Sequence, residues 1–276
     1  MSIAFVNNVK TVLLLGALMG LVVGVGAAFG GPSAILPAIL IAILMNFGAF
    51  FFSSKLAISA MRGQEVTGGK LYDMVDELRQ RAGLPMPKVY VCPQQAPNAF
   101  AAGRSPKHAA VAVTEGALQL LNRQELEGVM AHELAHVKNR DTLTSTIAAT
   151  VGGLMAMLAY GMMFFGGHGR GGNPLVLIVT VIVGAVGAAV IKGMISRSRE
   201  FVADADGARI AGSPDGLVSA LRKLEMYAKR IPMQNPNPAQ NNLFIIEPLT
   251  GGQTLSNLFA THPPTEKRVE ALNTLR

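Results

Sequence analysis

The stretch VMAHELAHVKNRD, residues 129–141, places two histidines on either side of a short segment with a glutamate, directly before an uncharged apolar run. On a helix, residues four apart share a face, so His132 and His136 can bind one metal ion together. Glu133 lies one position round that helix, from where its carboxylate can reach a water on the ion. The alternative is an ordinary buried helix with unrelated histidines, but two of only five histidines in the chain fall here. The pattern predicts a zinc site that still lacks at least one protein ligand.

The composition is that of a membrane protein. Hydrophobic residues make up 50% of the 276 residues and the mean hydropathy is +0.37, whereas charged residues make up only 15%. A soluble globular domain has about 25% charged residues. The net charge is +7, but there is no block of Lys and Arg and no Trp, which argues against nucleic-acid binding. Cys92 is the single cysteine, so no intramolecular disulfide can form, as suits a reducing compartment.

Residues 11–54 contain no charge, and the sequence GGPS at 30–33 interrupts this apolar run. One continuous helix would measure about 66 Å at about 1.5 Å per residue, roughly twice the hydrocarbon core of a bilayer. We therefore expect two transmembrane helices, at about 11–29 and 33–52, joined by a short turn. A cleaved signal peptide is the alternative, but the immediate second apolar run favours a retained hairpin.

A second pair of apolar runs follows the histidine motif. We expect transmembrane helices at about 142–166 and 172–193, because each contains an uncharged run close to the length of about 20 residues that a crossing requires. The glycine-rich link GGHGRGGNP separates them. The predicted layout alternates a transmembrane hairpin with part of one soluble domain, twice over, in residues 1–52, 53–141, 142–195 and 196–276.

The soluble parts carry both helix and strand patterns, which predicts an α+β fold. The segment LYDMVDELRQRA has apolar residues at helical spacing, and KVYVC, AFAAG and AAVAVT are typical of short strands. Further helices are expected at 115–122 and 124–139, in LVSALRKLEMYAKR and in TEKRVEALNTL. We expect a mainly helical domain with a small β-sheet.

Basic residues indicate which side of the membrane holds the soluble domain. The outer links of the two hairpins hold only Arg170. The other hairpin ends carry Lys10, Lys55, Arg62, Lys192, Arg197 and Arg199. By the positive-inside rule the soluble domain is cytoplasmic. The positive charge is thus mainly topological, and it also favours contact with anionic headgroups of the lipid bilayer.

The missing metal ligand is not supplied next to the motif, because the residues after His136 lack the HExxHxxGxxH extension. The remote candidates are His108, His168, His262 and Glu200. Two membrane crossings separate His136 from Glu200, which returns the chain to the same side, whereas His168 would lie in the outer link. This geometry favours Glu200, although a solvated charge beside basic residues would give the same pattern.

Three motifs occur in order: HELAH at 132–136, REFVAD at 199–204 and THPPTEKRVEAL at 261–272. Together they resemble the M48 zinc metalloproteases over nearly the whole chain, and the four-helix layout is similar to that of the bacterial membrane proteases of that family. The resemblance implies a zincin fold of the gluzincin type. It also implies a protein of the bacterial inner membrane that hydrolyses misfolded or damaged membrane proteins, in quality control and stress response.

The resemblance further implies the roles of particular residues. His132, His136 and Glu200 would bind one Zn²⁺ ion per chain. Glu133 would be the catalytic base. His262 would donate a hydrogen bond to the oxyanion, unless it is a structural cap beside two prolines.

The supporting residues have two interpretations each. Asp204 either orients a zinc ligand or is a charge on the helix surface. Arg268 either pairs with an acidic residue of the site or is solvated. The resemblance suggests that Asn98, Ala99 and Phe100 belong to an edge strand that binds an extended substrate by main-chain hydrogen bonds, and a buried core strand is the alternative.

Two other functions fit part of the sequence. A non-catalytic membrane scaffold stabilised by zinc is disfavoured, because a purely structural site needs no base such as Glu133 beside its first ligand. A narrow peptidase for lipidated peptides is disfavoured, because relatives with that activity have more membrane helices than the four predicted here. The sequence therefore predicts a zinc metalloendopeptidase that acts on membrane-protein or unfolded polypeptide chains.

Overall fold

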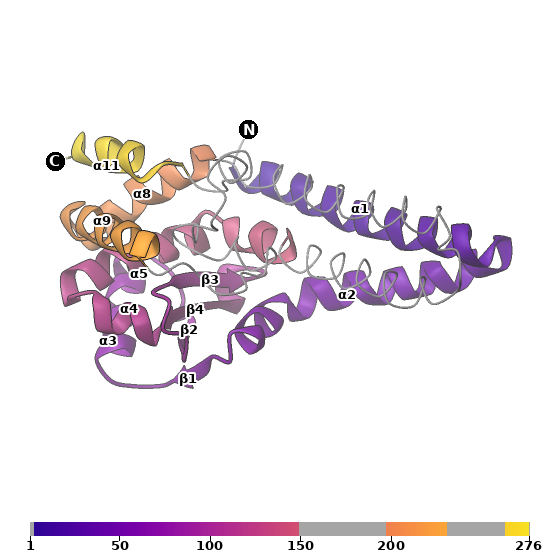
Figure 1. Cartoon of the computed structure of the whole chain (residues 1–276), viewed down its shortest axis with the longest axis horizontal. Helices are drawn as coiled ribbons and strands as arrows, with labels where there is room; N and C mark the ends of the chain where they lie inside the picture. Colours follow the sequence, from indigo (N-terminus) through magenta and orange to yellow (C-terminus); the bar gives the residue numbers. More distant parts are fainter. Residues whose placement is uncertain (1–2, 149–196, 231–262, 276) are drawn as a thin grey trace.

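The computed structural model describes residues 3–148, 197–230 and 263–275, and it places two long helices beside a body of shorter helices and one β-sheet (Figure 1). The long helices are α1 (Ile3–Gly30) and α2 (Ile35–Ala60), which pack on each other and project from the body. The fold is therefore mainly helical with a small mixed sheet, as expected from the sequence.

The turn between α1 and α2 forms where GGPS interrupts the apolar run. Gly31 has a φ of 64°, which glycine adopts at little cost, and Pro32 begins the short helix η1 (Pro32–Ala34). Helix α1 begins well before the predicted start at 11, and α2 begins at Ile35 but continues well past the predicted end at 52. The reason is that helical hydrogen bonding continues past the charged residues that flank the apolar runs. Those charges mark the end of the apolar segment and not the end of the helix.

Both α1 and α2 are long and apolar enough to cross a bilayer, with candidate spans Asn8–Ala27 and Pro32–Ala60. Their outward side chains are large and apolar. Leu13, Leu36 and Leu44 are 61%, 67% and 70% exposed among the described residues. An apolar surface of this extent suits contact with lipid or with other apolar helices, not with water.

A third helix follows α5 directly and is described over residues 141–148. Its Ile147 packs with Leu14 and Leu18 of α1, and all three side chains are fully buried. This contact connects the histidine segment to the first membrane hairpin. The remainder of the predicted second hairpin, with its helices at 142–166 and 172–193, lies outside the described residues from position 149 to position 196.

The β-sheet has the strand order β1-β2-β4-β3. Strands β2 and β4 are parallel, and the other two pairs are antiparallel. Three strands match the predicted segments, namely β2 (Lys88–Cys92), β3 (Ala99–Gly103) and β4 (Ala109–Thr114). The sequence does not predict β1 (Gln64–Val66), because three mostly exposed residues without apolar alternation carry no strand signal.

The described helices of the body are η2 (Pro106–His108), α3 (Lys70–Ala82), α4 (Glu115–Leu120), α5 (Arg123–Lys138), α8 (Arg197–Ala211), α9 (Asp215–Arg230) and α11 (Thr265–Asn273). Five of them (α3, α4, α5, α9 and α11) lie close to the predicted positions, and the two further helices, η2 and α8, had no predicted bounds. The amphipathic pattern of α3 is confirmed, since Met74, Val75 and Leu78 are buried.

The two faces of the sheet pack against different parts of the molecule. Val111 and Val113 belong to the main core with α3 and α5. Phe100 belongs to a second core, in which it packs with Ile58 and Met61 at the end of α2. The sheet therefore connects the metal-motif helix on one side to the membrane hairpin on the other.

Helix α5 is the centre of the soluble body. A capping box fixes its first turn, in which Asn122 Oδ1 accepts a hydrogen bond from Glu125 N and Glu125 Oε2 accepts one from Asn122 N. Glu125 also accepts hydrogen bonds from Ser219 and Lys223 of α9, at 2.6 and 2.8 Å. Because α5 packs against α3, α8, α9 and β3, most of its side chains are buried. The histidine motif is thus held in a fixed, water-poor position.

Helix α8 crosses α5 in close backbone contact at Gly207. A Cβ atom at this position would lie 2.9 Å from His132 Cα and 3.0 Å from His132 N. Side chains other than hydrogen do not fit so close to another backbone. Glycine here lets α8 approach the first histidine of the motif.

We expect Gly207→Ala to separate α8 from α5. The cost is that of overpacking a core, about 1–3 kcal/mol in the free energy of unfolding. Metal binding should weaken as well, because Glu200 lies on the helix that is displaced. Denaturant unfolding and the metal content of the full-length protein measure the two effects. The matched control is Gly68→Ala, at an exposed position with open space around it, and equal stability of the two variants would contradict the prediction.

Candidate metal centre

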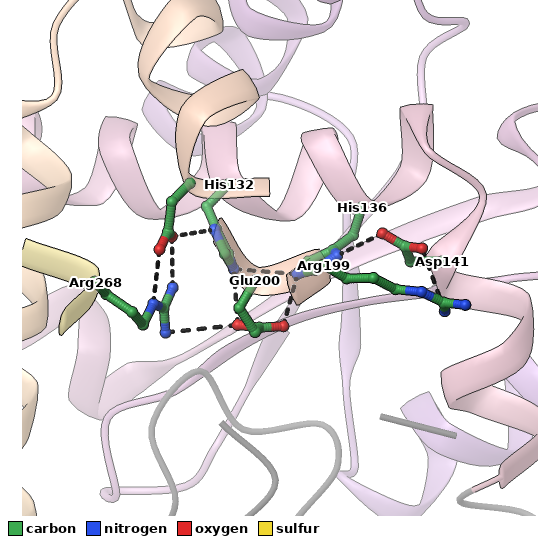
Figure 2. Close-up of polar contacts among 7 residues, drawn as sticks. His132, His136, Asp141, Arg199, Glu200 and Arg268 are labelled. Atoms are coloured by element: carbon green, nitrogen blue, oxygen red, sulfur yellow. Dashed lines mark hydrogen bonds and ion pairs between the residues drawn. The ribbon is translucent and has the colours of Figure 1, made fainter. Parts of the chain in front are cut away.

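Three side chains from two helices meet in the core of the body (Figure 2). Helix α5 supplies His132 and His136, and the first turn of α8 supplies Glu200. The two Nε2 atoms are 3.1 Å apart. Glu200 Oε1 lies 3.4 Å from His136 Nε2, and Glu200 Oε2 lies 3.8 Å from His132 Nε2. Each residue thus directs one potential ligand atom into a common space, and these atoms all lie within 4.8 Å of one another.

This arrangement fits a zinc ion. A tetrahedral zinc with bonds of about 2.0–2.2 Å to imidazole nitrogen and carboxylate oxygen holds its ligand atoms about 3.3–3.6 Å apart. Of the separations in the structure, 3.4 Å lies within that range, 3.1 Å lies just below it and 3.8 Å lies just above it. Two imidazoles and one carboxylate are also a donor set that proteins use for catalytic zinc, with the fourth position open.

The first histidine is supported by a buried carboxylate and a buried guanidinium. His132 Nδ1 lies 2.9 Å from Asp204 Oδ1. Arg268 donates to both oxygens of Asp204, from Nε at 2.9 Å and from Nη2 at 2.7 Å. Its Nη1 also lies 3.6 Å from Glu200 Oε2. Asp204 and Arg268 therefore lie inside the site, each only 1% exposed, and not on the surface.

The second histidine has a support of the same kind. His136 Nδ1 lies 3.2 Å from Asp141 Oδ2. Arg199 Nη1 lies 3.4 Å from the other oxygen of Asp141 (Figure 2). No sequence pattern singles out Asp141, because a charged residue directly before an apolar run is ordinary. The available signal was a carboxylate five positions after the second histidine.

The two carboxylates determine which ring nitrogens face the common space. When each Nδ1–H points at an aspartate, each Nε2 carries a lone pair. Two lone pairs 3.1 Å apart repel each other unless a cation or a proton lies between them. The centre is therefore built to hold positive charge.

The carboxylates around His136 also affect its protonation. Burial by itself lowers the pKa of His136, but the hydrogen bonds to Asp141 and Glu200 and the negative charges around it outweigh burial. The result is a pKa well above the ordinary value of 6.5. In the absence of a metal ion, a proton on His136 takes the place of the cation.

The supporting ion pair also lowers the pKa of a carboxyl group. Burial raises the pKa of Asp204, but the charge and hydrogen bonds of Arg268 and the contact with His132 lower it by more. Asp204 is therefore ionised at neutral pH and can polarise His132, which makes the imidazole a better metal ligand.

Glu133 lies on α5 between the two histidines in sequence and is 4% exposed. Its negative charge contributes to raising the pKa of His136 and of Arg268, which places the carboxylate within electrostatic reach of both. A buried carboxylate next to a metal centre suits the role of a proton acceptor.

The remaining predicted residues lie elsewhere. His108, a candidate third ligand, is exposed in η2, with Nδ1 3.0 Å from Ser105 Oγ. His262 lies outside the described residues. Asn98, Ala99 and Phe100 are buried, and β3 stands at one end of the sheet order among the described strands. Their side chains are therefore core residues, while the outer main-chain edge of β3 faces no described strand.

Comparisons with known proteins show which family the chain resembles. The sequence profile of peptidase family M48 matches residues 65–276. A protease HtpX homolog of Syntrophotalea carbinolica is 48% identical over 276 residues, which cover 98% of this chain and 99% of the relative. A protease HtpX homolog of Desulfatibacillum aliphaticivorans is 49% identical over 284 residues, which cover 98% of this chain and 90% of the relative.

The fold is also similar to a solved structure. The crystal structure of S. mikatae Ste24p matches with a TM-score of 0.52 and 17% sequence identity. The match covers 98% of this chain and 66% of that chain. At this identity the likeness concerns the fold alone, which is mainly helical with a small sheet in the chain described here.

We expect metal affinity to fall as the pH falls. A metal ion must displace the proton from His136, whose pKa is raised, so below that pKa affinity should drop by about tenfold per pH unit. Competition with a chelator between pH 8 and pH 6 measures the effect. Thermal unfolding of the metal-free protein over the same range separates metal release from unfolding. An affinity independent of pH would contradict the protonation of His136.

Proposed function

The chain belongs to peptidase family M48 and is a metalloprotease, and on this premise we propose that it is a zinc-dependent endoprotease embedded in a bacterial inner membrane, with its catalytic domain in the cytoplasm. The observation that carries the proposal is the convergence of His132, His136 and Glu200, with buried Glu133 beside them. This combination provides three metal ligands and one proton acceptor.

Each residue of the centre has a defined task in peptide hydrolysis. His132, His136 and Glu200 would hold the zinc ion. When bound, zinc lowers the pKa of a coordinated water to about 7 and polarises a substrate carbonyl. The carboxylate of Glu133 accepts a proton from the attacking water and passes it to the amine that leaves. Asp204 and Arg268 keep the first histidine in the required orientation.

His262 would complete the centre by donating a hydrogen bond to the oxygen of the scissile carbonyl as negative charge develops there. The support comes from the sequence, in which His262 stands six positions before Arg268. Arg268 reaches Asp204 and Glu200, so the chain enters α11 next to the metal ligands.

We propose that substrate binds as an extended chain along the outer edge of β3, at Ala99 and Phe100. Asn98 stands directly before this strand, where its main-chain N–H and C=O bond Thr114 and fix the start of the edge. The support is the position of β3 at the end of the sheet order among the described strands. A further extended chain could therefore pair with the outer edge of β3. The buried Ala99 and Phe100 side chains anchor β3 in the core. Recognition by main-chain hydrogen bonds would accept many sequences, as degradation of misfolded proteins requires.

The proposed substrates are misfolded or damaged membrane proteins, in quality control and stress response. Support comes from the short path between the centre and the apolar helices. Asp141 contacts His136, and the helix that begins at Asp141 packs on α1. Names of the relatives, protease HtpX homologs, are consistent with an enzyme of this kind.

We expect Glu133→Gln to abolish proteolysis while zinc remains bound. Loss of a general base costs about 10²- to 10⁴-fold in rate, whereas an isosteric amide leaves the three ligands in place. The assay is cleavage of an unfolded membrane-protein fragment, with zinc content measured on the same samples. Glu127→Gln is the matched control, because Glu127 lies on the same helix and pairs with Arg81.

Each of the other outcomes of that assay would indicate a different function for this chain. Equal cleavage by wild type and Glu133→Gln would contradict the role of Glu133 as the catalytic base. Zinc binding without any cleavage would indicate a zinc-stabilised scaffold. Cleavage confined to lipidated peptides would indicate a narrow peptidase.

The topology can be tested by thiol labelling in cells. Cys92, the single cysteine, is buried and can be replaced to give a cysteine-free background. Ser33→Cys in the outer turn should react with a membrane-impermeant reagent on intact cells. Lys107→Cys beside the sheet should react only after the membrane is permeabilised. The reverse pattern would place the catalytic domain on the outer side.

A further inference from the structure

The turn after α5 contains a pair of polar contacts that have no role in the hydrolytic mechanism. One carboxylate oxygen of Asp141 contacts Nδ1 of His136, and the other oxygen faces the guanidinium of Arg199. We propose that Asp141, held by Arg199, is a positioning residue for the second metal ligand, and that it ties this ligand to the membrane helix that begins at Asp141. The inference rests on the proposed zinc site but adds a connection between that site and the membrane.

The backbone between His136 and Asp141 is turned to make this contact. Arg140 has a φ of 58°, in the left-handed region that a residue with a Cβ atom adopts unfavourably. Its N–H donates to Val137 O at 3.2 Å, which closes the last turn of α5. The single left-handed residue ends α5 and starts the next helix at once, so that Asp141 faces back toward His136. A strained residue persists where the surrounding contacts hold it, and the contacts of Asp141 are of that kind.

Helix α8 secures the same turn at two points. Arg199 reaches Asp141 from the residue directly before the ligand Glu200. Farther along α8, Asp206 accepts a hydrogen bond from Asn139 Nδ2 at 3.0 Å. Of these two contacts, the Asp141–Arg199 contact leads to a metal ligand, whereas the Asn139–Asp206 contact joins the helices without touching one. The second contact therefore serves as an internal control.

The helix that starts at Asp141 is anchored on the first membrane hairpin. Ile147 packs with Leu14 and Leu18, and all three are fully buried. Thr144 Oγ1 and Thr11 Oγ1 lie 3.3 Å apart at the same interface. A shift of this helix against α1 displaces the carboxylate that orients His136. The position of the ligand is therefore linked to the packing of the membrane helices.

A simpler role for Asp141 is that of a negative charge at the start of a helix, which stabilises the helix by itself. Asn is as effective as Asp at helix starts, where both accept hydrogen bonds from free backbone N–H groups. Asp141→Asn therefore keeps the capping ability and the shape of the side chain. It removes the charge that strengthens the contacts to His136 and Arg199.

The test measures zinc affinity by chelator competition on the full-length protein in lipid nanodiscs. We expect Asp141→Asn to weaken zinc binding by about 10- to 100-fold, the usual effect of losing the partner of a metal-ligating histidine. Asp206→Asn removes one carboxylate charge from the same junction and should change affinity by less than about twofold. Thermal unfolding of both zinc-free variants should stay close to that of the wild type.

The outcomes separate this inference from the proposed function. Zinc binding by the wild type tests the metal site itself, and the difference between the variants tests the positioning role. Equal affinities of Asp141→Asn and Asp206→Asn would overturn the inference while the metal site stands. If Asp141→Asn does not assemble, Arg199→Gln provides the same comparison, with a smaller expected loss of affinity.

A double-mutant cycle tests the connection to the membrane. Leu18→Ala should loosen the helix that starts at Asp141 and weaken zinc binding several-fold in the wild-type background. In the Asp141→Asn background the same substitution should have little further effect, because the connecting carboxylate is already lost. Effects of the two substitutions that multiply, or no effect of Leu18→Ala, would overturn the connection between the membrane helix and His136.

Discussion

Two imidazole nitrogens and one carboxylate share a small buried space because α8 crosses α5 almost backbone to backbone. The crossing depends on Gly207, which leaves room for the backbone of His132. From this contact, Glu200 and Asp204 reach the two faces of the histidine cluster. Polar groups in a core are costly unless they are paired, and the paired charges here offset part of that cost while leaving Nε2 lone pairs directed at a common point.

The two ligand histidines are supported in the same way from different directions. Each Nδ1 faces an aspartate, and each aspartate faces an arginine. For His132 the arginine comes from α11 near the C-terminus, and the whole set is buried. For His136 it comes from the first turn of α8 and meets Asp141, at which the next helix begins. The first set fixes the ligand within the body of the molecule, and the second connects it to the helix that packs on α1.

Regular spacing made much of this arrangement predictable. The helical face shared by the two histidines, the break at GGPS and the strand segments all follow from local patterns. The structure brings the two histidines together on α5, and it confirms the break and the three strands. The pairing of Arg268 with an acidic residue of the site was one of two interpretations of the sequence, and the choice of Asp204 as its partner required the structure, because a lone arginine on a short helix does not indicate which carboxylate it meets. The sequence did not predict strand β1, because a pairing of three residues leaves no local pattern. It also missed the start of α1 and the end of α2, because the continuation of a helix past a charged residue leaves no local pattern either.

The sequence by itself determined which residue types could bind a metal ion and which segments could not remain in water, because helical periodicity and hydropathy are properties of neighbouring residues. The tertiary structure places Glu200, which the sequence favoured as the third ligand, with the two histidines and leaves His108 elsewhere. It also decided that Asp141 belongs to the metal centre as well as to the start of a helix. The physical reason is that these contacts join segments whose meeting depends on how helices cross, and a crossing is set by close packing at positions such as Gly207 that have no chemical role of their own.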